Sequence, residues 1–129
     1  MGKGEAGVSR MTPVAFNVLL ALVDGERHGY GIILEIEERS GGEVRLGPGT
    51  LYGALKRLRE GGLIEESDER PVPDLDDERR RYYRLTDLGA KALAAEVGRL
   101  DAAVRAARRK GVGPSPAPRT AFGTVPGSA

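Results

Sequence analysis

One segment of the chain combines a helix-forming pattern with side chains that can bind nucleic acid. It is Gly47-Pro-Gly-Thr-Leu-Tyr-Gly-Ala-Leu-Lys-Arg-Leu-Arg59, and Pro48 suits a first helical turn because its missing N–H would be unpaired there in any case. A buried stripe follows from leucines at i, i+4 and i+7, namely Leu51, Leu55 and Leu58. The other faces carry hydroxyl, phenol and cationic groups, from Thr50, Tyr52, Lys56, Arg57 and Arg59. Such a helix suits the major groove of DNA, and an ordinary amphipathic surface helix is the alternative.

The composition limits the classes of protein and of site. The 129 residues are enough for one domain, and the formal net charge of +1 means that a nucleic-acid surface must come from segregated charge. The chain has no cysteine, which excludes disulfides, thiol catalysis and thiolate metal sites. Residues 1–10 lack the apolar core of a signal peptide, and no run approaches the roughly 18 apolar residues of a membrane span. We therefore expect a soluble, cytoplasmic protein with no membrane partner and no cofactor.

Two helices are predicted before the segment described above. Residues 1–10 are rich in glycine and charge and are expected to form a flexible arm. The first helix then begins at Thr12-Pro13, which supplies an N-cap and a first-turn proline, and is nearly apolar all round. The second and third helices are predicted at residues 30–39 and 48–60.

A β-hairpin is predicted after the third helix, with strands at residues 63–67 and 79–85. Alternation along the second strand puts Tyr83 and Leu85 on one face, and Tyr83 is expected in the core. The opposite face carries Arg80, Tyr82 and Arg84. The loop between the strands is acidic at its tip and would be repelled by DNA, so we expect the strand arginines to make the contact.

The last predicted helix, residues 87–109, has the features of a dimerisation helix. Thr86 is a suitable N-cap. Four apolar residues with a 4-3-4 spacing give an a/d-like seam, formed by Leu93, Val97, Leu100 and Val104. The seam is either intrachain core or a dimer interface, and the lack of a later predicted element to cover it favours the dimer. Residues 111–129, rich in Pro, Gly, Ser and Ala, are predicted to be disordered.

The order of these elements predicts the fold class. Three helices, a hairpin and a further helix are typical of a winged helix-turn-helix, mainly α with a small β-hairpin, followed here by a long C-terminal dimerisation helix. We place the winged-helix DNA-binding domain at residues 11–86 and the dimerisation helix at residues 87–110. In such a domain the third helix enters the major groove, and the hairpin contacts the DNA backbone or the minor groove.

Several motifs in this order resemble the PadR-type transcriptional regulators. They are His28-Gly-Tyr-Gly-Ile32, Gly49-Thr-Leu-Tyr-Gly-Ala-Leu-Lys-Arg-Leu58, Gly62-Leu-Ile64 and Arg81-Tyr-Tyr-Arg-Leu-Thr-Asp-Leu-Gly89. One departure is Gly53, where the family commonly has proline. The resemblance implies a homodimeric repressor of the short subfamily. In that family the C-terminal helix pairs with its counterpart and with the partner's N-terminal helix, which adds Phe16 to the expected interface.

The predicted function is regulation of transcription, with repression as the expected direction, by a homodimer that binds a palindromic operator in double-stranded DNA. Whether a small-molecule effector releases the DNA is left open by the sequence. The residues predicted to contact DNA are Tyr30, Thr50, Tyr52, Lys56, Arg57, Arg80, Arg81 and Arg84. The resemblance is the ground for Tyr30, whose hydroxyl would reach a phosphate. Tyr52 packing at the helix base and Thr50 capping the helix are the alternatives for those two residues. Some short members bind planar drugs between aromatic residues, but helix 87–109 has no aromatic residue.

Two other functions compete with DNA-dependent regulation. A winged-helix protein-interaction module that binds no DNA is supported by the acidic loop and the low net charge. An enzyme is not expected, because the sequence has neither a metal-ligand cluster nor a phosphate-cradling loop. His28 is the only histidine and is interpreted as a turn residue.

Overall fold

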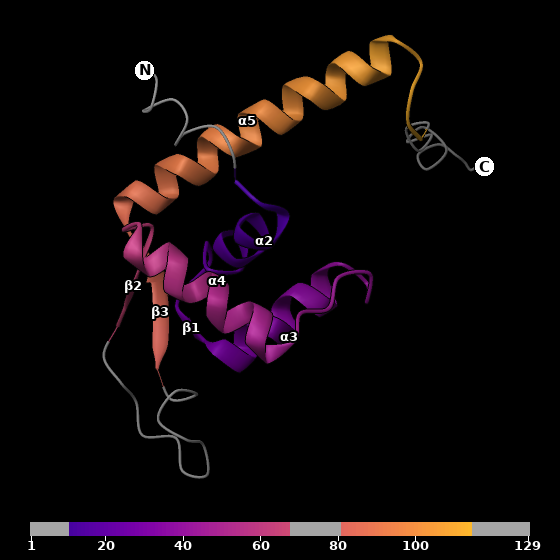
Figure 1. The fold of residues 1–129 in the computed structure, drawn as a ribbon. Helices are drawn as coiled ribbons and strands as arrows, with labels where there is room; N and C mark the ends of the chain where they lie inside the picture. Colours follow the sequence, from indigo (N-terminus) through magenta and orange to yellow (C-terminus); the bar gives the residue numbers. More distant parts are fainter. Residues whose placement is uncertain (1–10, 68–80, 115–129) are drawn as a thin grey trace, which may run out of the picture. The chain divides into compact units, whose positions relative to one another are not determined.

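The computed structural model describes residues 11–67 and 81–114. Within these ranges it has four helices and three strands (Figure 1), which are α2 (Pro13–Ala21), β1 (Arg27–His28), α3 (Gly29–Arg39), α4 (Pro48–Glu60), β2 (Ile64–Glu66), β3 (Tyr82–Leu85) and α5 (Asp87–Arg109). The predicted fold class, mainly helical with a small antiparallel β element, is confirmed. The chain divides into two compact units inside α5, between Val97 and Gly98. Residues 87–97 therefore group with the winged-helix elements.

The small sheet has one strand more than the predicted hairpin. The strand order is β1-β3-β2, and both pairings are antiparallel. β1 has only two residues, too few to show the alternation from which a strand is recognised, and His28 of β1 lies opposite Tyr82 of β3. β2 and β3 pair as expected, with Glu65 opposite Arg84 and Glu66 opposite Tyr83. β3 begins at Tyr82 in the part of the chain that the structure describes, later than the predicted start at residue 79.

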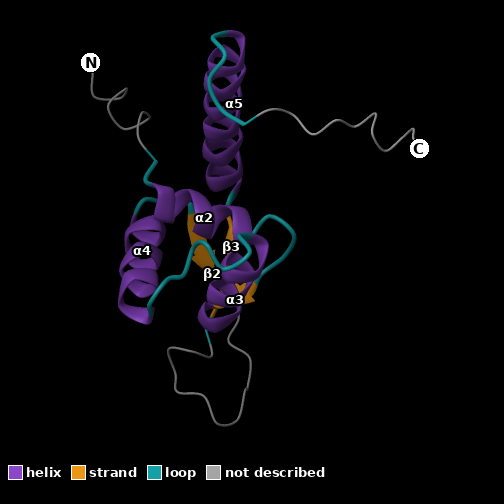
Figure 2. Cartoon of the chain, turned by 90° about the vertical axis from the view of Figure 1, so that its right-hand side faces the viewer, coloured by secondary structure: helices purple, strands orange, loops and turns teal. Residues whose placement is uncertain are grey.

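The core lies where α2, α3 and α4 pack together beside the sheet (Figures 1 and 2). The predicted leucine stripe of α4 is confirmed, because Leu51, Leu55 and Leu58 are all buried. Tyr83 of β3 is also buried, at 2% exposure, as its place in the alternation predicts. Burying a large apolar side chain contributes about 1.5–3 kcal/mol, so this stripe holds α4 firmly while its opposite side faces solvent.

Capping side chains set where α2 and α3 begin. Thr12 Oγ1 accepts a hydrogen bond from the Ala15 N–H at 3.0 Å, as its predicted role requires. His28 Nδ1 accepts one from the Gly31 N–H at 3.0 Å, so α3 starts at Gly29 and not at Tyr30. The single histidine is therefore a helix cap, which makes its interpretation as a turn residue incomplete. A histidine N-cap was missed because Ser, Thr, Asp and Asn are the usual residues at that position.

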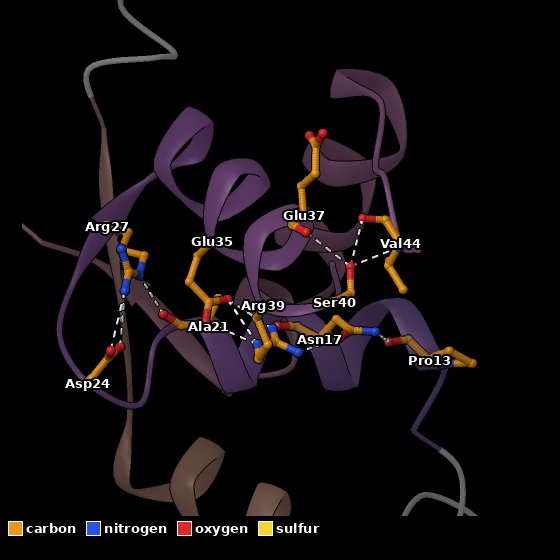
Figure 3. A network of polar contacts seen from close by, with 10 residues as sticks. All are labelled: Pro13, Asn17, Ala21, Asp24, Arg27, Glu35, Glu37, Arg39, Ser40 and Val44. Atoms are coloured by element: carbon orange, nitrogen blue, oxygen red, sulfur yellow. Dashed lines mark hydrogen bonds and ion pairs between the residues drawn. The ribbon is translucent and has the colours of Figure 1, made fainter. Parts of the chain in front are cut away.

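A network of polar contacts ties α2 to α3 (Figure 3). Arg39, at the end of α3, donates from Nη1 to Asn17 Oδ1 at 2.9 Å and from Nη2 to the Asn17 carbonyl at 3.2 Å. Its Nη2 also forms an ion pair with Glu35 at 2.9 Å. Arg27 Nε donates to the Ala21 carbonyl at 2.8 Å, which satisfies a carbonyl at the end of α2 that has no partner within the helix. The network fixes α3, and with it the start of the loop that leads into α4.

The start of α5 is held against the turn between α4 and β2. Thr86 Oγ1 accepts from the Gly89 N–H at 3.0 Å, which confirms its capping role, and donates to the Gly62 carbonyl at 2.6 Å. Gly89 itself is buried, and a Cβ added there would overlap the carbonyl oxygen of Leu63. Only glycine lets the helix backbone come this close to the turn.

Candidate nucleic-acid interface

The side of α4 that faces away from the core is polar and cationic. Thr50, Lys56 and Arg57 are all exposed there, as the leucine stripe predicts. Gly49 and Gly53 also lie on α4; an added Cβ at Gly49 would meet no atom within 4 Å, and at Gly53 it would meet only Arg57 Nη1, at 3.6 Å. This side of α4 therefore offers long donor side chains beside bare backbone, an arrangement that can enter a groove and donate to phosphate or base-edge acceptors.

Tyr52 lies between the exposed and the buried sides of α4. It is half-buried and packs against the core, and its ring and hydroxyl rest on Gly29 at the start of α3. A Cβ at Gly29 would lie 2.8 Å from Tyr52 Cζ and would overlap the hydroxyl oxygen. Tyr52 therefore packs at the helix base, as the alternative interpretation of this residue expects.

The two glutamates of β2 form ion pairs with arginines from α4 and from the segment that contains β3. Glu66 Oε2 forms an ion pair with Arg59 Nη1 at 2.6 Å and lies 3.7 Å from Arg81 Nη1. Glu65 Oε2 pairs with Arg84 Nε at 2.8 Å. Neither glutamate was predicted to belong to the site. The signal was present in the strand pairing, since residues that face each other across antiparallel strands interact, and Glu65 faces Arg84.

A pocket opens between α4 and β3. Its volume is about 160 Å³, and its walls come from Tyr52, Leu55, Lys56, Arg59, Arg81 and Tyr83. Burial, and secondly the nearby carboxylate of Glu66, raise the pKa of the Tyr83 phenol above its ordinary value of 10.0. That hydroxyl therefore stays protonated at neutral pH and can donate a hydrogen bond.

The predicted contact residues are only partly brought together. Lys56 and Arg81 meet at the pocket, with Tyr52 beside them. Tyr30 is 54% exposed and does not line the pocket. Thr50, Arg57 and Arg84 do not line the pocket, and Arg80 lies outside the described residues.

Residues 18–95 match the PadR-like family of transcriptional regulators. The chain belongs to this family. Known members regulate transcription, so the PadR-like chain is not an enzyme, in agreement with the prediction. Among the helices of the described residues, none combines the length and the apolar character that crossing a membrane requires.

Two curated relatives and one solved structure show how far the likeness extends. A 37.1 kDa protein in transposon TN4556 of Streptomyces fradiae is 44% identical over 61% of the PadR-like chain, but the match spans only 20% of that relative. A transcriptional regulator of Mycobacterium tuberculosis is 36% identical over 64% of the chain and 71% of its own length. The structure of Bacillus subtilis PadR in complex with operator DNA is 26% identical, covering 67% of this chain and 47% of that one, with a TM-score of 0.58.

The residues expected at a dimer interface differ in exposure. Leu93 is 5% exposed and belongs to the core of its own chain, so it has almost no surface left for a partner. Intrachain core, the alternative left open for the seam, therefore describes Leu93, because the start of α5 packs on the winged-helix unit of the PadR-like chain. Phe16 is partly buried against the same core. Val97, Leu100 and Val104 remain 45%, 44% and 46% exposed on α5.

Proposed function

We propose that the chain is a sequence-specific repressor of transcription that binds a palindromic operator as a homodimer. The exposed donor side of α4 is the observation that carries the proposal, because its leucines are buried while Thr50, Lys56 and Arg57 face solvent. In the proposed complex α4 lies in the major groove, and the cations beside β2 and β3 meet phosphates. The solved relative from Bacillus subtilis, recorded with operator DNA, supports this choice of ligand.

The homodimer of the proposal is built on α5. Val97, Leu100 and Val104 are each about half exposed and recur at spacings of three and four, which puts them on one side of the helix. Large apolar side chains in such a row gain free energy when a second copy covers them. A two-fold dimer would present two copies of α4 to half-sites about one helical turn, roughly 34–36 Å, apart. A cytoplasmic location belongs to the same proposal, because the regulator must reach DNA.

The ion pairs of β2 are the observation that favours the competing function. Glu65 and Glu66 neutralise part of the positive charge of Arg59, Arg81 and Arg84, which a protein-interaction module would tolerate better than a DNA-binding wing. Surface ion pairs contribute only about 0–1 kcal/mol, so these carboxylates do not prevent the arginines from also contacting phosphates. For this reason we favour DNA as the partner.

The salt dependence of duplex binding separates the two functions. Each phosphate contact adds about 0.9 to the slope of log affinity against log salt concentration. Two copies of α4 and its neighbouring strands give a slope above about 4 in magnitude. A flat response, or no binding to any duplex, would contradict the proposal and favour the protein-interaction module.

A further inference from the structure

We propose that the pocket between α4 and β3 is a preformed binding site for a tetrahedral oxyanion of the phosphate class. The inference rests on the proposed function only in so far as the phosphate belongs to a DNA backbone. It places Arg59, one of the cations of α4, in the pocket and adds Glu66 to the interface.

Among the described residues, the pocket walls carry more positive than negative charge. Three cations line the pocket, Lys56, Arg59 and Arg81, and within the same part of the chain the carboxylate of Glu66 contacts two of them, Arg59 and Arg81. Each guanidinium has five N–H donors, so an arginine that gives one or two to Glu66 retains donors for a second acceptor. An anion with several acceptor oxygens is the ligand that this donor set matches.

Glu66 holds the two arginines in place before any ligand arrives. Arg59 comes from the last turn of α4, while Arg81 directly precedes β3, and a single oxygen, Glu66 Oε2, contacts both. Glu66 is itself fixed by its pairing with β3, where it faces Tyr83. A site whose donors are already ordered loses less side-chain entropy on binding. We therefore assign Glu66 as a positioning residue of the pocket.

The remaining walls fit the same ligand. Tyr52 and Tyr83 bring phenol groups to the pocket, and Tyr83 stays a neutral donor at physiological pH. Leu55 is the one aliphatic wall residue among those described. The volume of about 160 Å³ is well above the roughly 10–15 Å³ that a single water needs, so the pocket has room for an oxyanion together with waters.

Inorganic phosphate is the probe for the first experiment. It is titrated into the full chain while NMR follows the signals of Tyr52, Arg59 and Tyr83. We expect saturable shifts that Lys56→Gln weakens about tenfold or more, as loss of a charge-assisted hydrogen bond should. Lys91→Gln is the control, because Lys91 is an exposed cation on α5 that does not line the pocket. Shifts that do not saturate, or an equal loss in Lys91→Gln, would overturn the proposal.

Arg59→Gln tests the same site from a second side. This variant also breaks the ion pair with Glu66, so circular dichroism must first show that its fold is intact. Lys56→Gln leaves that ion pair in place and keeps the test decisive if Arg59→Gln unfolds. Glu66→Gln should weaken phosphate binding although it removes a negative charge, because the two arginines lose their common anchor. Tighter phosphate binding in Glu66→Gln would contradict its positioning role.

A mixed-sequence DNA duplex then identifies the source of the phosphate. If the duplex displaces inorganic phosphate and Lys56→Gln lowers the salt slope by about 1 for each subunit, the pocket receives a backbone phosphate. If phosphate stays bound in the presence of the duplex, the ligand is a free phosphate or a phosphate ester, and the proposed oxyanion site is supported. Saturable phosphate binding without any duplex binding would contradict the proposed function but support the phosphate site. Duplex binding that neither phosphate nor Lys56→Gln affects would contradict the phosphate site but support the proposed function.

Discussion

The hydroxyl of Tyr52 occupies the space beside Gly29 that a Cβ would need. Gly29 is the first residue of α3, and Tyr52 belongs to α4, so this contact makes the position of a predicted DNA-contacting side chain depend on the neighbouring helix. Gly29 thus has a steric role. It links the motif at residues 28–32 to the motif at residues 49–58, which contains Tyr52.

Substitution of Gly29 by alanine should displace Tyr52 without unfolding the domain. The atoms that the new methyl group meets are the far end of a flexible side chain, so we expect a loss of about 1–3 kcal/mol in the free energy of unfolding. Truncation of Tyr52 in the Gly29→Ala background removes the overlap. Thermal unfolding of both single variants and the double variant should therefore show strong non-additivity, of about 0.5–3 kcal/mol. Additive effects would show that the two residues do not touch.

Gly89→Ala should be more damaging than Gly29→Ala. Its Cβ overlaps a backbone carbonyl, that of Leu63, which cannot rotate away, so α5 must shift off the turn between α4 and β2. Gly98→Ala is the matched control, since a Cβ there meets no atom within 4 Å. It should leave the free energy of unfolding unchanged or raise it by up to about 1 kcal/mol through better helix propensity. Equal stability of Gly89→Ala and the parent protein would refute the close approach.

A charge in the α5 seam should produce monomers. Leu100→Asp puts a carboxylate where the proposed partner helix packs, so sedimentation should show the monomer mass and operator binding should be lost. Ala102→Asp places the same side chain two residues away, on the opposite side of α5, and should remain dimeric. An intact dimer in Leu100→Asp, or dissociation in both variants, would show that the seam is misplaced.

Removal of the Glu65 carboxylate should strengthen DNA binding. Glu65 pairs with Arg84 at 2.8 Å, and Glu65→Gln removes the negative charge that offsets this cation. Affinity for operator and scrambled duplexes should rise alike, because phosphates carry no sequence information, and the salt slope should steepen by up to about 1 per subunit. Asp101→Asn, which breaks an exposed ion pair with Arg105 on α5, is the control and should change neither quantity. Weaker binding by Glu65→Gln would mean that Arg84 does not contact DNA.

The helices were predictable because each has a local signal. The bounds of α4 and α5 agree with the sequence analysis, since a first-turn proline marks one start and Thr86 the other. β1 was missed because two residues carry no period. The burial of Leu93 in its own chain was not predictable, because helical spacing shows which residues share a side of α5 but not that the start of the helix packs on its own domain.

The candidate site was less predictable than the fold. The exposed side of α4 follows from its leucine stripe, but the Tyr52–Gly29 contact and the clamp of Glu66 on Arg59 and Arg81 join elements that are distant in sequence. Such contacts depend on how the helices pack and on the register of β2 against β3. No pattern within one element reports them.

Recovery of bound sequences from a pool of random duplexes tests sequence-specific recognition most directly. The purified full chain should enrich a palindrome whose half-sites lie about 10 base pairs apart, centre to centre. Arg57→Gln should lower the ratio of operator to scrambled affinity, because Arg57 is exposed on α4 outside the pocket and a good base contact contributes about 1–3 kcal/mol of discrimination. Repeated rounds with folded protein that enrich no sequence, or enrich only a single half-site, would contradict the account of a dimeric, sequence-reading regulator.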